Sequence, residues 1–432
     1  MDSQQRPIGV DLFAGAGGMT LGFEQAGFDV LAAVEIDPIH CATHEFNFPH
    51  TAILCRSIED ITGEEIRKHS YIGDRQIDVV FGGPPCQGFS IIGKREFYDP
   101  RNALILHFVR LVLELKPLFF VMENVPGLAF NKHQKLLDET IELFYSNGYQ
   151  VEEDYRVLNA ANYGVPQDRS RLFLLGNRIG LSLPKYPQPI TKPIRNFIRN
   201  AITLSDLPIC PSVEDAIADL PEVESYPQLL IRDWVEAADY GKPSNYSSQL
   251  RCLFPQEDDY SCDRLFDPSI LTSSRRTKHS LECMARFSNT KPGEAEPISR
   301  FYKLDSTGLC NTLRAGTASN RGAFTSPRPI HPSSPRCITV REAARLHSYP
   351  DWFRFHVTKW HGFRQIGNSV PPKLASSIAT EIIRALGVTP VKPLHTLELK
   401  NQQLLELNMS QAAQYYGVSA HVIEPRTKPL TK

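Results

Sequence analysis

The stretch PIGVDLFAGAGGMTLGFEQAGFDVLAAVEI, residues 7 to 36, decides the predicted fold. It contains an apolar run that predicts a strand, then a glycine-rich turn, a segment with helical periodicity and a second apolar strand. The alternation continues through IDVVFGG (77–83), ALILHFVRLVLELK (103–116), PLFFVMENV (117–125) and RLFLLGN (171–177). Such alternation predicts an α/β fold: a doubly wound, mostly parallel sheet with helices on both faces and an active site at the carboxyl ends of its strands.

The character of the sequence changes near residue 181. Prolines become frequent, hydrophobic periodicity weakens, and loops rich in Ser, Asn, Gly and Pro continue to about residue 336. Order returns in the helix-like segments 339–350 and 363–386. We therefore expect a first domain, residues 1–180; a smaller irregular domain with a hinge, residues 181–350; a return segment that completes the first domain, residues 351–387; and a C-terminal tail, residues 388–432.

The tail allows two interpretations. In SQAAQYYGVSAHVI (410–423), Ala413, Gly417 and Ile423 have the spacing of a helix-turn-helix motif, but Pro425 would shorten the second helix. We therefore favour an amphipathic helix that docks on the protein over a DNA-binding tail.

Composition favours a globular protein of a reducing compartment. The chain has 432 residues, of which 41% are hydrophobic. Its nine cysteines form no CxxC pair and no His/Cys metal spacing, so we expect no metal site. The first residues lack the pattern of a signal peptide, and no apolar run approaches the ~18 residues of a membrane span. We therefore expect a cytoplasmic protein with no membrane association.

Charge is unevenly distributed along the chain. The net charge is −1, yet residues 271–341 hold 12 Lys or Arg and 4 Asp or Glu, a net charge of +8. Residues 212–263 hold 3 Lys or Arg and 12 Asp or Glu, a net charge of −9. This distribution is compatible with a basic face that binds nucleic acid, and equally with an uneven solvated surface.

The glycines of DLFAGAGGMTLGF (11–23) lie between the first strand and the first helix, where they let a ligand approach the backbone. Their spacing is not GxGxxG, because Thr20 stands in place of the third glycine, and this weakens a pyrophosphate site. Glu35, at the end of the second strand, can accept hydrogen bonds from ribose hydroxyls. Together these features suggest a nucleoside cofactor without a diphosphate, although a tight turn of any α/β protein would look similar.

Two reactive side chains follow neighbouring strands. Cys86 lies in FGGPPCQGFS (81–90), where glycines and prolines end the strand and display the residues beyond it. A thiol there could be a nucleophile if its environment favours the thiolate, or it could be inert. Glu123 follows the apolar strand 117–122, so its pKa should be raised and it could donate a proton or a hydrogen bond. A helix cap or a buried ion pair would also explain Glu123.

Two arginines enter the last strand on alternate positions. Arg169 and Arg171 of QDRSR (167–171) therefore lie on one face of the strand. Their guanidinium groups suit phosphate oxygens or a carbonyl oxygen, and equally surface salt bridges.

Six segments, in this order along the chain, resemble the motif series of the DNA (cytosine-5) methyltransferase family of the bacterial type. The resemblance covers roughly residues 7–178 and 330–386. The segments are DLFAGAGG, VEIDP, GGPPCQGFS, ENVPG, QDRSR and GNSVPP.

The resemblance implies the methyltransferase fold that uses S-adenosylmethionine as its cofactor. This cofactor carries no phosphate, in agreement with the departure from GxGxxG. Glu35 would bind its ribose and Asp60 would face its adenine amino group. The implied cofactor pocket contains Phe13, Gly15, Gly17, Glu35, Ile36, Asp60, Ile61, Pro85, Leu104, Asn368 and Ser369.

The resemblance also implies a mechanism, with Cys86, Glu123, Arg169 and Arg171 as catalytic residues. Cys86 would add to C6 of cytosine and Glu123 would hydrogen-bond N3. Arg171 would contact O2, and Arg169 would brace the loop or a phosphate. The cytosine must be flipped out of the duplex, and the loop 87–102 could then close over the DNA. The expected DNA contacts are Ser90, Arg314 and Arg321.

The partner implied by the resemblance is double-stranded DNA, read by a target-recognition domain within residues 181–350. We expect a monomer in a restriction-modification system, with a cognate endonuclease that acts separately. Two alternatives remain open: a cytosine-5 methyltransferase that acts on tRNA, and a catalytically silent DNA-binding regulator.

Overall fold

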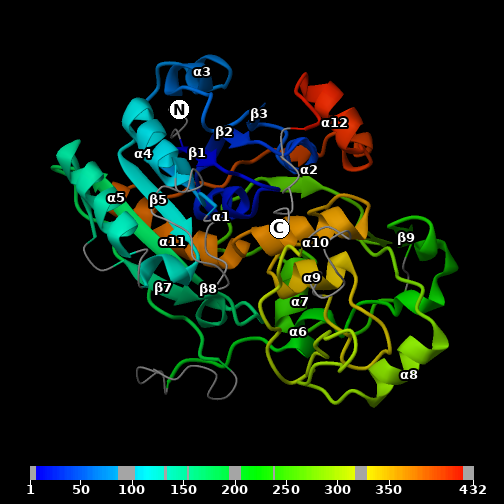
Figure 1. Ribbon diagram of the computed structural model, residues 1–432. Coiled ribbons are helices and arrows are strands. Elements are labelled where there is room, and N and C mark those ends of the chain that lie inside the picture. Colours follow the sequence, from blue (N-terminus) through cyan, green and yellow to red (C-terminus); the bar gives the residue numbers. More distant parts are fainter. Residues whose placement is uncertain are drawn as a thin grey trace, which may run out of the picture.

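The computed structural model describes residues 6–85, 103–130, 134–152, 155–193, 206–236, 239–316 and 328–421. Eight of the strands in these residues form one sheet with helices against it (Figure 1). The strands of this sheet are β1 (Ile8–Leu12), β2 (Asp29–Glu35), β3 (Ala52–Cys55), β4 (Val79–Gly82), β5 (Phe119–Asn124), β6 (Tyr149–Val151), β7 (Arg156–Asn159) and β8 (Ser170–Arg178). The helices among and after them are α1 (Gly18–Ala26), α2 (Pro38–Asn47), α3 (Gly63–Lys68), α4 (Ala103–Leu115), α5 (Gln134–Ser146), α9 (Val340–Leu346), α10 (Lys359–Asn368) and α11 (Pro372–Leu386).

The strand order is β3-β2-β1-β4-β5-β8-β6, and β7 also pairs with β8. Strands β1 to β5 are parallel, whereas β8 runs antiparallel to β5, β6 and β7. The prediction of a doubly wound, mostly parallel sheet is therefore confirmed. The order reverses between β1 and β4, and a ligand crevice is expected at the carboxyl ends of these two strands.

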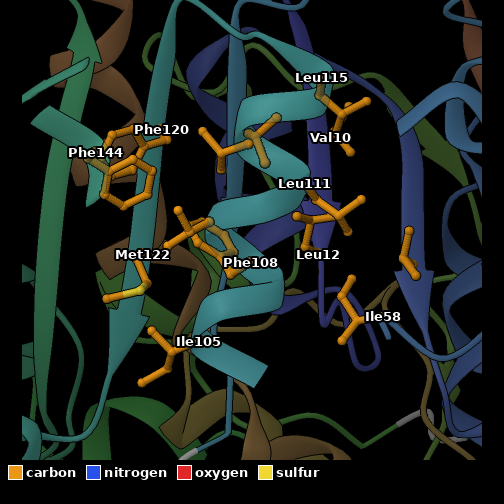
Figure 2. Packing of buried hydrophobic residues seen from close by; sticks show 14 of the residues in the cluster. Val10, Leu12, Ile58, Ile105, Phe108, Leu111, Leu115, Phe120, Met122 and Phe144 are labelled. Carbon is orange, nitrogen blue, oxygen red and sulfur yellow. The ribbon is translucent and has the colours of Figure 1, made fainter. Parts of the chain in front are cut away.

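Helices cover both faces of the sheet. Because the side chains of a strand alternate between these faces, each strand contributes residues to two hydrophobic cores. In β5, Phe120 and Met122 pack with α4 and α5 in one cluster, while Phe119 and Val121 pack with α1 and α11 in another. Figure 2 shows the first cluster, in which Phe108 and Leu111 of α4 lie over Leu12 and Met122. The apolar segments from which we predicted the strands and helices thus form two hydrophobic cores. These cores hold the ends of the strands in position.

The segment after β8 has little regular structure, as predicted for residues 181–336. Its elements are short: α6 (Val213–Ile217), α7 (Asn245–Leu250), α8 (Leu281–Asn289), β9 (Val235–Glu236), β10 (Asp263–Leu265) and β11 (Ile270–Leu271). A third cluster joins this segment to the rest of the chain, because Val213 and Tyr246 pack with Leu21 of α1 and with residues of α9 and α10. In Figure 1 the segment lies beside the sheet, next to α9 and α10.

The C-terminal tail folds back onto the protein. Its strand β12 (Thr396–Glu398) pairs in parallel with β10. Its helix α12 (Met409–Tyr416) lies against α2, where the hydroxyls of Tyr415 and Tyr416 donate to the Glu45 carboxylate at 3.0 and 2.8 Å. This contact agrees with the favoured interpretation of a docking helix. Among the described residues, no helix is long and apolar enough to cross a membrane.

Candidate active site

A cavity of about 400 Å³ opens at the carboxyl ends of the parallel strands. The residues that follow β1, β2, β4 and β5 line it, together with Arg171 of β8. Its remaining wall comes from the far end of the chain, where α10 ends and residues 367–370 lead into α11. The strand-order reversal between β1 and β4 predicts a crevice at this edge of the sheet.

The glycine turn after β1 forms the floor of the cavity. Gly15 has φ +55°, and a Cβ atom added there would meet nothing within 4 Å, so the backbone is open toward a ligand. Gly17 serves packing instead: it has φ +99°, and an added Cβ would lie 2.3 Å from the Phe48 ring. A Cβ on Gly18 would lie 2.6 Å from the Val370 carbonyl oxygen, so α1 can approach the return segment only with glycine at that position.

The Glu35 carboxylate is fixed at the end of β2 by two backbone groups. Its Oε2 accepts a hydrogen bond from the Gly15 amide, and its Oε1 accepts one from the Asp37 amide, both at 2.8 Å. An ionised carboxylate has about four acceptor positions, so two remain for a ligand. Glu35 is thus preorganised to receive hydroxyl donors.

A buried polar network lies behind the glycine turn. The Thr20 hydroxyl donates to Asp11 Oδ2 at 2.6 Å and lies 3.4 Å from His44 Nε2, while His44 Nδ1 lies 3.3 Å from the Gly15 carbonyl oxygen. Burial raises the pKa of Asp11 to about 8 and lowers the pKa of His44 to about 3. Both groups are therefore neutral at pH 7, and the network connects β1, α1 and α2 to the turn.

Glu123, at the end of β5, pairs with Arg171 of the adjacent strand. Arg171 Nε lies 2.8 Å from Glu123 Oε1, and both side chains are largely buried. Burial raises the pKa of Glu123 above its ordinary value, although Arg171 and Arg169 act in the opposite direction. The raised pKa predicted from the sequence is confirmed, and the carboxyl can hold a proton more readily than an exposed one.

The backbone that leads to Cys86 passes directly beside this pair. A Cβ atom added at Gly83 would lie 2.6 Å from Glu123 Oε2, and the side-chain Nδ2 of Asn124 donates to the Pro84 carbonyl oxygen at 3.0 Å. Glycine at position 83 therefore permits the end of β4 to approach the Glu123 carboxyl. Cys86 itself lies outside the described residues.

Arg169 contacts backbone carbonyl groups, not the phosphate that was one of its predicted partners. Its side chain is fully buried and donates to the carbonyl oxygens of Leu313, Gly367 and Ser369 at 2.7, 2.8 and 2.7 Å. A fully buried guanidinium cannot reach a DNA phosphate. Arg169 instead ties the return segment and residue 313 to β8, whereas we predicted that it braces the loop or a phosphate.

The structure brings most of the predicted site residues together. The cavity is lined by Phe13, Gly15, Glu35, Ile36, Pro85, Glu123, Arg171, Asn368 and Ser369. Four predicted cofactor residues are not among its described lining. Gly17 packs against the Phe48 ring, Asp60 is exposed, Ile61 is buried in the core under α4, and Leu104 packs against that core. The predicted DNA contacts Ser90 and Arg321 lie outside the described residues, and Arg314 is exposed.

Sequence reasoning missed four ionisable residues of the lining. They are Asp11, Asp37, His40 and Arg364. Asp11 stands inside the motif DLFAGAGG and Asp37 inside VEIDP, so their places in these motifs could have indicated them. His40 and Arg364 occur in helical segments, where a polar residue usually faces solvent, and no local signal indicates that they face a cavity.

The cavity suits a cofactor without phosphate groups. Two arginines line its described part, and each is already paired: Arg364 Nη1 lies 2.6 Å from Asp37 Oδ2, and Arg171 binds Glu123. Each guanidinium therefore already has a carboxylate partner that balances its charge, whereas Glu35 can accept from hydroxyls. Within the described ranges, no group of three or more His, Cys, Asp or Glu side chains could hold a metal ion.

Comparison with known proteins agrees with this geometry. The model of the family described as C-5 cytosine-specific DNA methylase matches residues 9–384. Type II methyltransferase M.XorII of Xanthomonas oryzae pv. oryzae is 57% identical over 427 residues, which cover 99% of this chain and 96% of that protein. Type II methyltransferase M.DdeI of Desulfomicrobium norvegicum is 34% identical over 391 residues, which cover 86% of this chain and 88% of that protein.

A solved structure is also similar. It is the crystal structure of a protein assigned as a DNA modification methyltransferase encoded within an E. coli prophage. The two chains are 34% identical, with a TM-score of 0.69, and the match covers 88% of this chain and all of the other.

Proposed function

Because the chain belongs to the C-5 cytosine-specific DNA methylase family, and is thus a DNA (cytosine-5) methyltransferase, we propose the following reaction. The protein, acting as a monomer, methylates C5 of a flipped-out cytosine in a specific double-stranded DNA sequence, with S-adenosylmethionine as the methyl donor and a covalent bond between Cys86 and C6. The type II names of its relatives support a restriction-modification setting with a separate endonuclease.

One observation carries this proposal: the close approach between the end of β4 and the Glu123 carboxyl. Gly83 lies against Glu123, and Arg171 binds the same carboxyl from the other strand. Cys86 follows Gly83 by three residues in the sequence, and we propose that its thiol reacts at this end of the sheet. A nucleophile, a proton-holding carboxyl and a guanidinium at one sheet edge are the groups that addition to a pyrimidine ring requires.

The cavity residues would hold the methyl donor. Glu35 would accept hydrogen bonds from the ribose, the open backbone at Gly15 would lie against the amino-acid part, and Asn368 and Ser369 would close the pocket from the return segment. S-adenosylmethionine, when bound, supplies a methyl group activated by its sulfonium charge. The absence of an unpaired guanidinium from the described lining supports this phosphate-free donor over a dinucleotide.

The protein's own groups account for the activation of the base. The Cys86 thiolate forms a bond to C6, and the electron pair of the C5–C6 double bond moves into the ring toward C5 and N3. Glu123, whose pKa is raised by burial, would take up a proton and donate a hydrogen bond to N3, which stabilises the charge there, while Arg171 contacts O2. After methyl transfer, loss of the C5 proton and departure of the Cys86 sulfur restore the double bond.

DNA would approach the cavity from the side of residues 181–350, which we propose as the target-recognition domain. Arg314 is exposed next to Leu313, whose carbonyl oxygen Arg169 holds. A Cβ atom on Gly367 would lie 2.3 Å from the Arg314 carbonyl carbon, so Arg314 borders the segment that lines the cavity. An exposed arginine whose backbone lies against the cavity-lining residue Gly367 supports a contact to the phosphates that flank the flipped base.

A trapping experiment tests the proposal. DNA in which 5-fluorocytosine replaces cytosine prevents the loss of the C5 substituent, so the bond to Cys86 should persist. We expect a complex stable to denaturing electrophoresis that needs the methyl donor, forms with DNA and is absent for Cys86→Ala. Trapping on fluorinated tRNA but not on DNA would establish the alternative substrate, and no trapping on either would contradict the covalent mechanism.

A further inference from the structure

One face of helix α10 connects the irregular segment with the cavity. Lys359, Phe363 and Gly367 follow one another at intervals of four residues in this helix, so they form one row on its surface. Figure 1 shows α10 beside the irregular segment, and each residue of the row contacts a different part of that segment. The row ends at the cavity, because Gly367 belongs to the cavity lining.

A lysine and an arginine lie together at the beginning of this row. The Lys359 ammonium donates hydrogen bonds to the Arg276 carbonyl oxygen at 3.0 Å and to the Thr277 hydroxyl at 2.7 Å. These bonds hold it near Arg275, whose positive charge acts on the ammonium. An ammonium has three donors, so one remains for a ligand after these two bonds.

Two further arginines lie along the row toward the cavity. The Arg328 guanidinium lies 5.8 Å from the centre of the Phe363 ring, and its charge also acts on Lys359. A Cβ atom on Gly367 would lie 2.3 Å from the Arg314 carbonyl carbon, so Arg314 lies at the cavity end of the row. We use the name basic row for the side chains of Arg275, Lys359, Arg328 and Arg314.

Carboxylates do not balance the charges of the basic row. Among the residues that the structure describes, no Asp or Glu forms an ion pair with any of its members. Burial, together with the charges of Arg328 and Arg275, lowers the pKa of Lys359 to about 8. The ammonium is still charged at pH 7, so like charges repel one another in the folded protein. A bound anion would offset this repulsion.

The basic row is accessible and extended. Arg314 is exposed, and its other three members are partly exposed, so a ligand can reach them from solvent. From Lys359 to Gly367, α10 rises by about 12 Å at 1.5 Å per residue. Phosphates of one DNA strand follow one another at about 3.4 Å along the duplex axis, so this length corresponds to roughly three or four base steps. Positive groups spread over such a length suit a polyanion better than a single small anion.

We propose that the basic row binds consecutive phosphates of one DNA strand along α10. Arg314 contacts the phosphates next to the target base, and Arg328, Lys359 and Arg275 hold the strand farther from the cavity. Contacts to phosphates position a duplex without reading its sequence. The inference rests on the proposed function, because it assumes that the target base of a DNA duplex enters this cavity.

The test is the salt dependence of DNA binding, measured by fluorescence anisotropy with a labelled duplex and the full chain in the presence of S-adenosylhomocysteine. Each phosphate contact contributes about 0.9 to the slope of log affinity against log salt concentration. We expect Lys359→Gln and Arg328→Gln each to reduce the wild-type slope by about this amount. The affinity lost between about 50 and 200 mM salt should then be roughly three- to fourfold smaller than in the wild type.

Arg286 provides a matched control. It belongs to the same basic stretch of sequence, but its guanidinium pairs with Glu282 at 3.1 Å and with Glu296 at 3.3 Å. Arg286→Gln changes the net charge by the same amount and should keep the wild-type slope. Lys359→Arg, which keeps the positive charge, should also keep it. A change in the folded fraction of a variant shifts its affinities equally at all salt concentrations and leaves the slope unchanged.

The outcomes separate this inference from the proposed function. A wild-type slope in both Lys359→Gln and Arg328→Gln would overturn the phosphate contacts and leave the proposed function intact. An equal reduction in Arg286→Gln would show a general effect of net charge, and this result would overturn the inference as well. A wild-type protein that binds no duplex would instead contradict DNA as the substrate, and the inference with it.

Discussion

Arg171 of β8 and Glu123 of β5 form an ion pair, with 2.8 Å between Nε and Oε1, at the edge of the sheet where the cavity opens. The two strands are antiparallel neighbours, so the pair is held by the sheet rather than by a loop. The position of the carboxyl is therefore fixed before any ligand binds. Residues that act on a transition state benefit from such preorganisation.

Replacement of Glu123 by Gln should separate chemistry from binding. The amide has the same shape as the carboxyl but cannot release or take up a proton at N3. We expect the single-turnover rate constant of methylation to fall by about 10²- to 10⁴-fold, the usual contribution of a proton-transferring side chain. The affinity for S-adenosylhomocysteine should change less than threefold. A single-turnover methylation assay with saturating DNA measures the first quantity, and a variant with more than a tenth of the wild-type rate would contradict the role of Glu123.

Arg169 should contribute to stability. Its replacement by Ala removes three charge-assisted hydrogen bonds, to the carbonyls of Leu313, Gly367 and Ser369, of which the Ser369 carbonyl keeps a contact of 3.1 Å to His347 Nε2. We expect the free energy of unfolding in urea to fall by about 3 to 5 kcal/mol. Arg384→Ala is the matched control, because that side chain is 68% exposed and should cost less than about 0.5 kcal/mol. Equal effects of the two substitutions would refute the bracing role.

Asp11 should make stability depend on pH in a predictable direction. Its pKa is 3.8 without burial and about 8 in the folded protein, so the folded state binds the proton more tightly. Stability from this group is therefore fully present below about pH 4 and is lost as pH rises through about 8. Asn is isosteric with the protonated carboxyl and does not titrate.

Asp11→Asn should consequently gain stability relative to the wild type as pH rises. The difference between the two free energies of unfolding should grow between pH 5 and pH 9, by about 2 to 5 kcal/mol at the upper end. Chemical denaturation at four pH values measures it. A difference that stays constant over this range would mean that Asp11 is ionised in the folded protein.

The C-terminal tail should behave as part of the core. Leu405 is fully buried in a cluster with Ala42, Phe46 and Leu404, so Leu405→Ala should destabilise the protein by about 2 to 5 kcal/mol. Leu394→Ala, at a fully exposed position of the same tail, should have little effect. Below the unfolding temperature, neither variant should bind DNA more weakly than the wild type. A stable Leu405→Ala protein with weakened DNA binding would instead favour a DNA-binding tail.

Hydrophobic patterning predicted the sheet and its helices because both faces of the sheet are buried, and each strand is therefore a continuous apolar run. The same pattern could not predict that β8 runs antiparallel to β5, since a buried strand is apolar in either direction. It also could not separate α10 from α11 within the predicted ordered segment 363–386. That separation follows from Pro371 and Pro372, which end one helix and begin the next.

Residues of the candidate site could be predicted from the sequence when they lie at the ends of strands, and less well when they lie elsewhere. Glu35, Glu123 and Arg171 directly follow or enter strands, and topology brings strand ends together. Arg169 lies two residues before Arg171 and on the same face of the strand. Its hydrogen-bond partners, however, are carbonyl groups 144 to 200 residues away in sequence, and only tertiary packing brings them to this side chain. His40 faces the cavity from a helix, where sequence periodicity gives no such indication.

Bisulfite sequencing tests the central claim most directly. The protein and its Cys86→Ser variant would be expressed in cells that lack cytosine methylation, and the genomic DNA of both would be converted and sequenced. Cytosines protected in one short sequence motif by the wild type, and unprotected with the variant, are the predicted result. No protected motif, with a folded protein that binds S-adenosylhomocysteine, would contradict DNA as the substrate.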